Sequence, residues 1–221
     1  MSLAVLTDFD GTVAATDASY AVLERFGDKK WLRIEKEALE YRITILEALK
    51  LQARMVKASP EEASDYIKEN VKPREGFREF ANWCRDNDIH LEICSDGFGW
   101  TIEVLLDHWD LDWIPWTSNA TIPKKEGWEI TFPYRKEGCP INANCKCSHY
   151  ERLKERYDKV LFIGDGTTDE CVAKKAEIVF ARDKLLEICK KDKINCIPWE
   201  DWGEIKKYVD VQFKDLILRK S

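Results

Sequence analysis

Two aspartates one residue apart, Asp8 and Asp10, directly follow an apolar run in the stretch VLTDFDGT. In a strand, residues i and i+2 point to the same side, so both carboxylates leave the end of a buried strand together. A later apolar run, LFIGDGTTDE, ends in Asp165 and Asp169. Carboxylates are the hard oxygen ligands that Mg²⁺ prefers. We therefore predict a magnesium site at Asp8, Asp10 and Asp165.

A metal ion beside paired carboxylates suits phosphoryl transfer. One carboxylate can attack the phosphorus as a nucleophile and form an acyl phosphate, which we expect of Asp8. The neighbouring carboxyl group, Asp10, can protonate the leaving alkoxide and later activate water. The phosphoryl oxygens need hydrogen-bond donors. We expect these donors to be the Ser95 hydroxyl, the Lys146 ammonium and backbone N–H groups around Gly11 and Gly97.

The elements that must position these groups are short apolar runs that alternate with helical patterns. The runs are LAVLTDFD, HLEICSDG, KVLFIGDG, EIVFARD and NCIPW. This alternation predicts an α/β fold, a doubly wound, mostly parallel, Rossmann-like sheet covered by helices on both faces. In such sheets ligands bind beyond the carboxyl ends of the strands, where the acidic residues stand.

Two segments between the runs have the spacing of core-facing crossover helices. They are residues 75–88 and residues 98–109. The residues expected to face the core are Phe77, Phe80, Ala81, Cys84, Ile102, Leu105 and Leu106.

The segment after the first strand contains almost no strand pattern and predicts three or four helices, with a break near Thr44. Ser59, Pro60 and Glu62 have the types and spacing of a helix start. We predict a catalytic core at residues 1–15 and 73–221 and a helical cap at residues 16–72. A second irregular segment, residues 113–135, predicts a hairpin around Gly127 appended to the sheet.

Four short motifs in order, DFDGT, CSDG, Lys146 within CKCSHYERL, and GDGTTDE, resemble those of the haloacid dehalogenase superfamily of phosphatases. The resemblance implies Asp8 as nucleophile and Asp10 as acid/base. It also implies Ser95 and Lys146 as phosphate ligands, Asp165 as metal ligand and Asp169 as its support. The dehalogenases of this superfamily lack the second aspartate, so dehalogenation is disfavoured.

The place of the helical insertion looks like that in the branch with phosphoserine phosphatase and the methionine-salvage enol-phosphate phosphatase. Phosphoserine phosphatases tend to carry Glu where Asp17 stands, so this substrate-binding position resembles the salvage enzyme better. Both relatives more often have Gly in place of Asp96, which we expect to join Gly97 in the phosphate loop. A phosphoserine phosphatase and a receiver-like phospho-switch without hydrolysis remain the alternatives.

The composition of the chain disfavours some classes of binding partner. The 221 residues carry a formal net charge of −6, which disfavours nucleic acid, because nucleic-acid binding depends on Lys and Arg. No apolar run approaches the roughly 18 residues of a membrane span, and no signal peptide opens the chain. We expect a cytoplasmic protein that acts on a small phosphorylated metabolite. The oligomeric state stays open, a homodimer included.

Three of the eight cysteines, Cys139, Cys145 and Cys147, precede or flank Lys146, with His149 nearby. Thiols at this spacing are compatible with a structural Zn²⁺ site, although the pattern is not that of a standard finger. A disulfide and reduced thiols are the other two alternatives. A zinc site here would stiffen the loop that presents Lys146.

Overall fold

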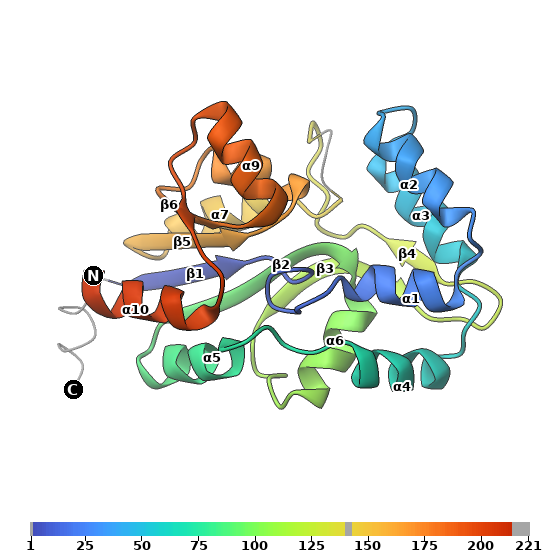
Figure 1. Cartoon of the computed structure of the whole chain (residues 1–221), viewed down its shortest axis with the longest axis horizontal. Coiled ribbons are helices and arrows are strands. Elements are labelled where there is room, and N and C mark those ends of the chain that lie inside the picture. Colours follow the sequence, from blue (N-terminus) through green and yellow to red (C-terminus); the bar gives the residue numbers. More distant parts are fainter. Residues whose placement is uncertain (1, 140–142, 214–221) are drawn as a thin grey trace.

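The computed structural model describes residues 2–139 and 143–213, which form a seven-stranded sheet between two layers of helices (Figure 1). The strand order is β4-β3-β2-β1-β5-β6-β7, and the neighbouring pairs are parallel except β3 with β4. The strands are β1 (Leu3–Thr7), β2 (His90–Phe98), β3 (Trp116–Ile122), β4 (Glu129–Thr131), β5 (Lys159–Gly164), β6 (Ile178–Ala181) and β7 (Ile197–Pro198). The predicted doubly wound, mostly parallel sheet is confirmed.

Helices cover both faces of the sheet, and Figure 1 shows α7 and α9 above it with α5, α6 and α10 below. The covering helices are α5 (Phe77–Asp86), α6 (Gly99–His108), α7 (Lys146–Lys154), α8 (Glu170–Ala173), α9 (Asp183–Asp192), α10 (Trp202–Gln212) and the 3₁₀ turn η1 (Thr167–Asp169). The seven residues predicted to face the core from α5 and α6 are all buried.

The central strand β1 explains why two apolar layers form. Side chains alternate across a strand. Leu3 and Val5 pack into one apolar cluster, whereas Ala4 and Leu6 pack into the other, on the opposite face. All five residues of β1 are buried, which is typical of a strand covered on both sides.

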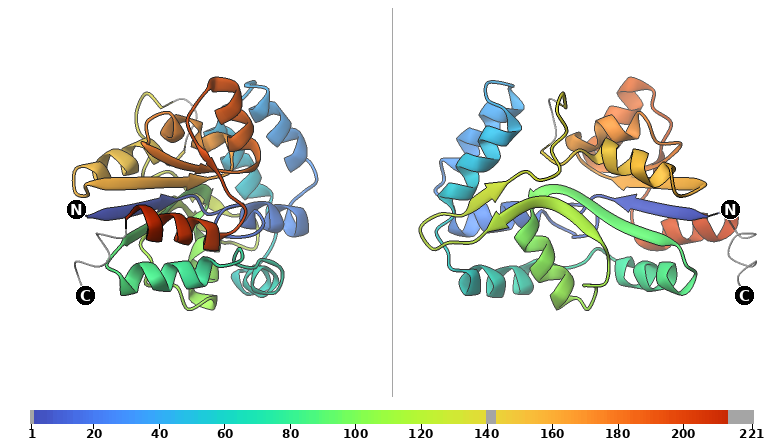
Figure 2. Two further views of the ribbon diagram at one scale, coloured as in Figure 1. Left: turned by 60° about the vertical axis from the view of Figure 1, so that its left-hand side comes forward. Right: turned by 180° about the vertical axis from the view of Figure 1, so that it is seen from behind.

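Four helices follow β1, namely α1 (Ala18–Phe26), α2 (Trp31–Leu39), α3 (Ile45–Met55) and α4 (Pro60–Asn70). Thr44 and Ser59 begin α3 and α4 with capping boxes, in which each hydroxyl accepts from the backbone of the glutamate three residues later. The predicted break near Thr44 and the helix start at Ser59 are confirmed. Figure 2, which adds the view from behind, shows α2 and α3 rising at one end of the sheet. The division into core and cap stays a prediction.

The hairpin around Gly127 forms, but it differs from the prediction in one respect. Strand β3 pairs in parallel with β2, with Ile93 opposite Trp116, so β3 belongs to the main sheet. Only β4 is appended, as an antiparallel edge. A strand that continues the parallel ladder was not apparent from the hairpin pattern, because that pattern records neighbouring residues and not the pairing with β2.

Within the described part of the chain, no helix has both the length and the apolar character needed to cross a bilayer.

Candidate active site

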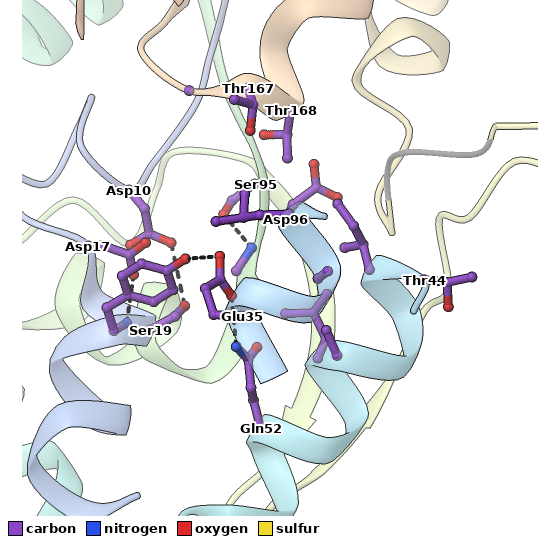
Figure 3. A pocket seen from close by; sticks show the side chains of 18 of the residues that line it. Asp10, Asp17, Ser19, Glu35, Thr44, Gln52, Ser95, Asp96, Thr167 and Thr168 are labelled. Atoms are coloured by element: carbon purple, nitrogen blue, oxygen red, sulfur yellow. Dashed lines mark hydrogen bonds between the residues drawn. The ribbon is translucent and has the colours of Figure 1, made fainter. Parts of the chain in front are cut away.

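The carboxyl ends of β1, β2 and β5 meet at one edge of the sheet. The last residue of β1 is in register with Ile93 on β2 and Ile163 on β5. The next residue, Asp8, donates its backbone N–H to the carbonyl of Ile163 at 2.9 Å. Asp8, Ser95 and Asp165 therefore line one pocket, which has a volume of about 540 Å³ (Figure 3).

A buried ammonium lies beside Asp8. Lys146 is 0% exposed, and its Nζ is 2.8 Å from Asp8 Oδ1 and 2.5 Å from Asp169 Oδ1. Burial lowers the pKa of Lys146, but the charges of Asp169 and Asp8 outweigh it and hold that pKa well above its usual value. Lys146 is therefore a buried, positively charged group directly beside the carboxylate of Asp8.

Three carboxylates crowd the same place. One oxygen each from Asp8, Asp165 and Asp169 lies within 4.8 Å of the others. Burial, opposed by Lys146 and assisted by the other two acids, raises the pKa of Asp8 well above its usual value. Burial and then the charge of Asp169 raise the pKa of Asp165 to about 6. Asp169 is already engaged, because its Oδ2 accepts the backbone N–H groups of Asp165 and Gly166, each at 3.0 Å.

The Asp10 side chain lines the same pocket and bonds to the start of α1. Its Oδ1 accepts the backbone N–H of Ala18 at 2.7 Å, and its Oδ2 is 3.5 Å from Ser19 Oγ. Burial, opposed by the hydrogen bond from Ala18, raises the pKa of Asp10 to about 6. A Cβ on Gly97 would lie 2.4 Å from Asp10 Oδ2, so the glycine makes room for this carboxylate. The position of the Asp10 carboxylate gives no support to its predicted role as a metal ligand.

Two glycines and two hydroxyls shape the phosphate end of the pocket. Ser95 Oγ accepts the N–H of Gly97 at 2.9 Å, so this N–H, a predicted phosphate donor, has a partner within the protein. Gly11 has φ +73°, and a Cβ there would lie 2.3 Å from Asp165 Oδ2. Thr12 donates its hydroxyl to Asp165 Oδ1 at 2.6 Å. Sequence reasoning missed Thr12, although it ends the DFDGT motif.

Asp96 joins the phosphate loop to the segment before Lys146. It lines the pocket, and its Oδ1 accepts the backbone N–H of Asn144 at 2.7 Å. Asn144 is 0% exposed, donates from Nδ2 to the carbonyl of Ser95 at 3.0 Å, and meets His149 Nε2 with Oδ1 at 2.7 Å. Burial, opposed by the charge of Lys146, raises the pKa of Asp96 to about 6. Nothing in the sequence pointed to Asn144, because its partners come from other elements.

Asp17 lines the pocket from the start of α1. Its Oδ1 accepts the backbone N–H of Tyr20 at 2.7 Å, so it caps this helix. Burial, followed by the charge of Asp10, raises the pKa of Asp17 well above its usual value. The wall beyond it comes from α2, α3 and the turn between them, with Glu35, Ala38, Leu39, Arg42, Ile43, Ile45, Leu49 and Gln52 among the lining residues.

Cys139 and Cys145, before α7, and Cys147, in its first turn, lie near a fourth cysteine, Cys171 of α8. Burial and then the thiols of Cys171, Cys145 and Cys139 raise the pKa of Cys147 to about 12. All eight cysteines are free. Among the described residues, the three aspartates are the only group of three or more metal-ligating side chains whose ligand atoms all lie within 4.8 Å of one another. The disulfide alternative is therefore absent here, and the arrangement gives no support to zinc.

The chain is similar to known proteins in sequence along most of its length. The family model of haloacid dehalogenase-like hydrolases matches residues 5–174. The chain is 31% identical to the 2-hydroxy-3-keto-5-methylthiopentenyl-1-phosphate phosphatase of Geobacillus thermodenitrificans, over 92% of this chain and 93% of that protein. It is 28% identical to the protein of the same name from Bacillus velezensis, over 93% and 89% of the two chains.

Solved structures of phosphoserine phosphatase share the fold. A substrate-bound complex aligns with a TM-score of 0.70 and 23% identity, over 94% of this chain and 98% of the other. A phospho-aspartyl intermediate analogue aligns with a TM-score of 0.69, 23% identity and the same coverage. At this identity the likeness concerns the fold alone.

Proposed function

The chain belongs to the haloacid dehalogenase-like hydrolase family and is a phosphatase, and we propose that it hydrolyses a small phosphomonoester with Mg²⁺ through a phosphoaspartate at Asp8. One observation carries this proposal. Asp8 directly follows the central strand and lines the pocket, with the buried cation Lys146 at 2.8 Å and a carboxylate oxygen of Asp165 within 4.8 Å.

The two steps divide between Asp8 and Asp10. An oxygen of Asp8 attacks phosphorus, the ester P–O bond breaks, and the protonated carboxyl of Asp10 gives its proton to the leaving alkoxide. Water then attacks the phosphoaspartate while the Asp10 carboxylate takes a proton from it, which releases orthophosphate and restores Asp8. Lys146 and the Ser95 hydroxyl stabilise the negative charge of the transferring group.

The donor set fits a divalent cation. Asp8 and Asp165 are hard oxygen ligands close together, and burial and the neighbouring acids raise the pKa of both. Asp169 holds Lys146 and two backbone N–H groups, so we assign it a supporting role. Mg²⁺ bound here would neutralise the crowded charges and draw electron density from the phosphoryl oxygens. Zinc is not part of the proposal.

The substrate we propose is the methionine-salvage enol phosphate. Relatives that share 28–31% identity over nearly the whole chain bear the name of that phosphatase. Phosphoserine is the second candidate, supported by the shared fold of phosphoserine phosphatases. The phospho-switch is set aside, because the chain is a phosphatase.

Phosphate release tests the proposal, measured with and without Mg²⁺ on the enol phosphate, phosphoserine, sugar phosphates and p-nitrophenyl phosphate. We expect one ester to exceed the others at least about tenfold in kcat/KM, and Asp8→Asn to abolish turnover while its circular dichroism stays that of the wild type. Asp86→Asn, on the outer end of α5, is the matched control and should turn over normally. Release by Asp8→Asn at the wild-type rate would show that Asp8 is not the nucleophile.

A further inference from the structure

Three polar side chains from three helices meet in the pocket wall opposite the phosphate end. Tyr20 of α1 donates its hydroxyl to Glu35 Oε1 at 2.5 Å, and Gln52 of α3 donates from Nε2 to Glu35 Oε2 at 2.8 Å. Gln52 is 2% exposed. Figure 3 shows Glu35 and Gln52 on the side of the pocket away from Thr167 and Thr168. The Glu35 carboxylate is therefore held in one orientation at the pocket wall.

The Glu35 carboxylate can accept further hydrogen bonds. An ionised carboxylate offers about four lone-pair sites, and the two hydrogen bonds occupy two of them. Among the described residues, no Lys, Arg or His forms an ion pair with Glu35. A buried or half-buried acceptor with free lone pairs is satisfied by a donor on a bound molecule.

An uncovered apolar wall adjoins Glu35. The α2–α3 side of the pocket includes Ala38, Leu39, Ile43, Ile45 and Leu49. Leu39 is 63% exposed, although it faces a cavity. A ligand with an apolar tail would cover this surface and remove it from water, which favours binding.

The basic side chains of the wall are scarce. Of the described residues that line the pocket, Arg42 alone is basic, and it already pairs with Glu40. The same wall carries three carboxylates, Asp17, Glu35 and Glu47, and this excess of negative charge disfavours a carboxylate on the substrate.

We propose that Glu35, positioned by Tyr20 and Gln52, determines specificity by accepting a hydrogen bond from a substrate hydroxyl while the α2–α3 wall packs an apolar tail. The substrate class is phosphomonoesters of hydroxylated chains that end in an uncharged apolar tail. This inference rests on the proposed phosphatase function of the same pocket and adds the chemistry of the organic half.

Four esters separate the parts of this proposal: 2-hydroxyhexyl phosphate, hexyl phosphate without the hydroxyl, glycerol phosphate without the tail, and 2-aminohexyl phosphate. For the wild type we expect kcat/KM for 2-hydroxyhexyl phosphate to exceed each of the others by about tenfold or more, because a site built for a hydroxyl rejects analogues that lack it. Most of the difference should appear in KM, since the contact is far from the reacting atoms.

Glu35→Leu removes the acceptor at similar size. It should reduce the preference for 2-hydroxyhexyl over hexyl phosphate to about one, mainly through a higher KM for the hydroxylated ester. Tyr20→Phe should reduce the preference less, because Gln52 still holds the carboxylate. Glu37→Gln is the matched control on α2, since Glu37 pairs with Arg33 and does not line the pocket.

An unchanged preference in Glu35→Leu overturns the role of Glu35. A preference of the wild type for the amino ester that Glu35→Leu abolishes overturns the hydroxyl in favour of an ammonium ligand. If Glu35→Leu unfolds, Tyr20→Phe carries the test, and an unchanged preference in that variant counts against the proposal. Failure of the wild type to hydrolyse any ester, p-nitrophenyl phosphate included, would instead reject the phosphatase function itself.

Discussion

At the residue scale, two aspartates two positions apart occupy different environments. Asp8 faces the ammonium of Lys146, whereas Asp10 accepts the N–H of Ala18 at the start of α1. Burial raises the pKa of Asp10 to about 6, which brings its protonated form closer to neutral pH. Different environments for paired carboxylates are how one site assigns one acid as nucleophile and the other as proton donor.

The first prediction concerns Asp10→Asn, which keeps the size of the side chain but cannot supply a proton. An alkoxide needs that proton and p-nitrophenolate does not. We therefore expect kcat/KM, which covers the steps up to departure of the alcohol and not the later hydrolysis of the phosphoaspartate, to fall by roughly 10² or more with hexyl phosphate and much less with p-nitrophenyl phosphate. Asp88→Asn, outside the pocket, is the control. An equal loss with both esters would argue that Asp10 is not the acid.

At the element scale, Asn144 joins three elements next to the lysine. Its side chain contacts the Ser95 carbonyl on β2, Thr117 on β3 at 3.3 Å, and His149 on α7. Lys146 begins α7 two residues later. The depth of the lysine beneath the pocket therefore depends on this buried amide.

Asn144→Leu should expose that dependence. The apolar side chain leaves the Ser95 carbonyl and the ring of His149 without their partner, and each unpaired buried group costs about 1–3 kcal/mol. Urea denaturation should show a loss of about 2 kcal/mol or more in the free energy of unfolding. Asn82→Leu, on the half-buried side of α5, should lose less than 1 kcal/mol. Equal losses in the two variants would contradict the role of Asn144.

The contact between Asn144 and His149 also predicts that stability depends on pH. Burial, opposed by the charge of Glu92, lowers the pKa of His149 below its usual value of 6.5. The unfolded chain therefore binds a proton near pH 6.5 that the folded chain does not, so stability is complete above that pH and falls as the pH drops through it.

His149→Gln keeps a donor for the Asn144 amide and removes the titration. Between pH 6.5 and 5 the free energy of unfolding should fall less steeply than in the wild type, by up to about 1.4 kcal/mol per pH unit. Urea titrations at a series of pH values measure the slopes. His108→Gln, exposed at the end of α6, is the matched control, because it removes a histidine that does not contact Asn144. A wild-type slope in His149→Gln would mean that His149 titrates alike in both states.

At the scale of the whole molecule, the pocket lies between a rigid sheet and a thinly packed helix pair. Every residue of β1 is buried. In α2 the buried residue is Trp31, and in α3 the buried residues are Ala48, Gln52 and Ala53. Regions with little buried apolar surface open at lower free energy than the core.

Amide hydrogen exchange should therefore be faster in α2 and α3 than in β1 and β5. Addition of Mg²⁺ with beryllofluoride, a phosphoryl mimic that requires the Asp8 carboxylate, should slow exchange in α2 and α3, because these helices line the occupied pocket. Asp8→Asn should show no such slowing. Protection of α2 and α3 equal to that of β1 before addition would contradict this difference in local stability.

The sequence by itself determined the features that depend on neighbouring residues. Alternating apolar runs specified the strands, and Thr44 and Ser59 marked helix starts, because a cap is a contact over three residues. The acidic residues were found because parallel strands bring their carboxyl ends to one edge. The fold class and the family followed from these patterns and their order.

Only the tertiary structure decided which side chains meet across elements. Asn144 reaches Asp96 across 48 positions, and Gln52 reaches Glu35 across 17 positions on a different helix. The spacing of Asp8 and Asp10 predicts two carboxylates that point the same way, whereas the structure bonds the Asp10 carboxylate to the backbone N–H of Ala18. Such contacts depend on how helices and loops pack in space, and residue spacing along the chain does not encode a distance between elements.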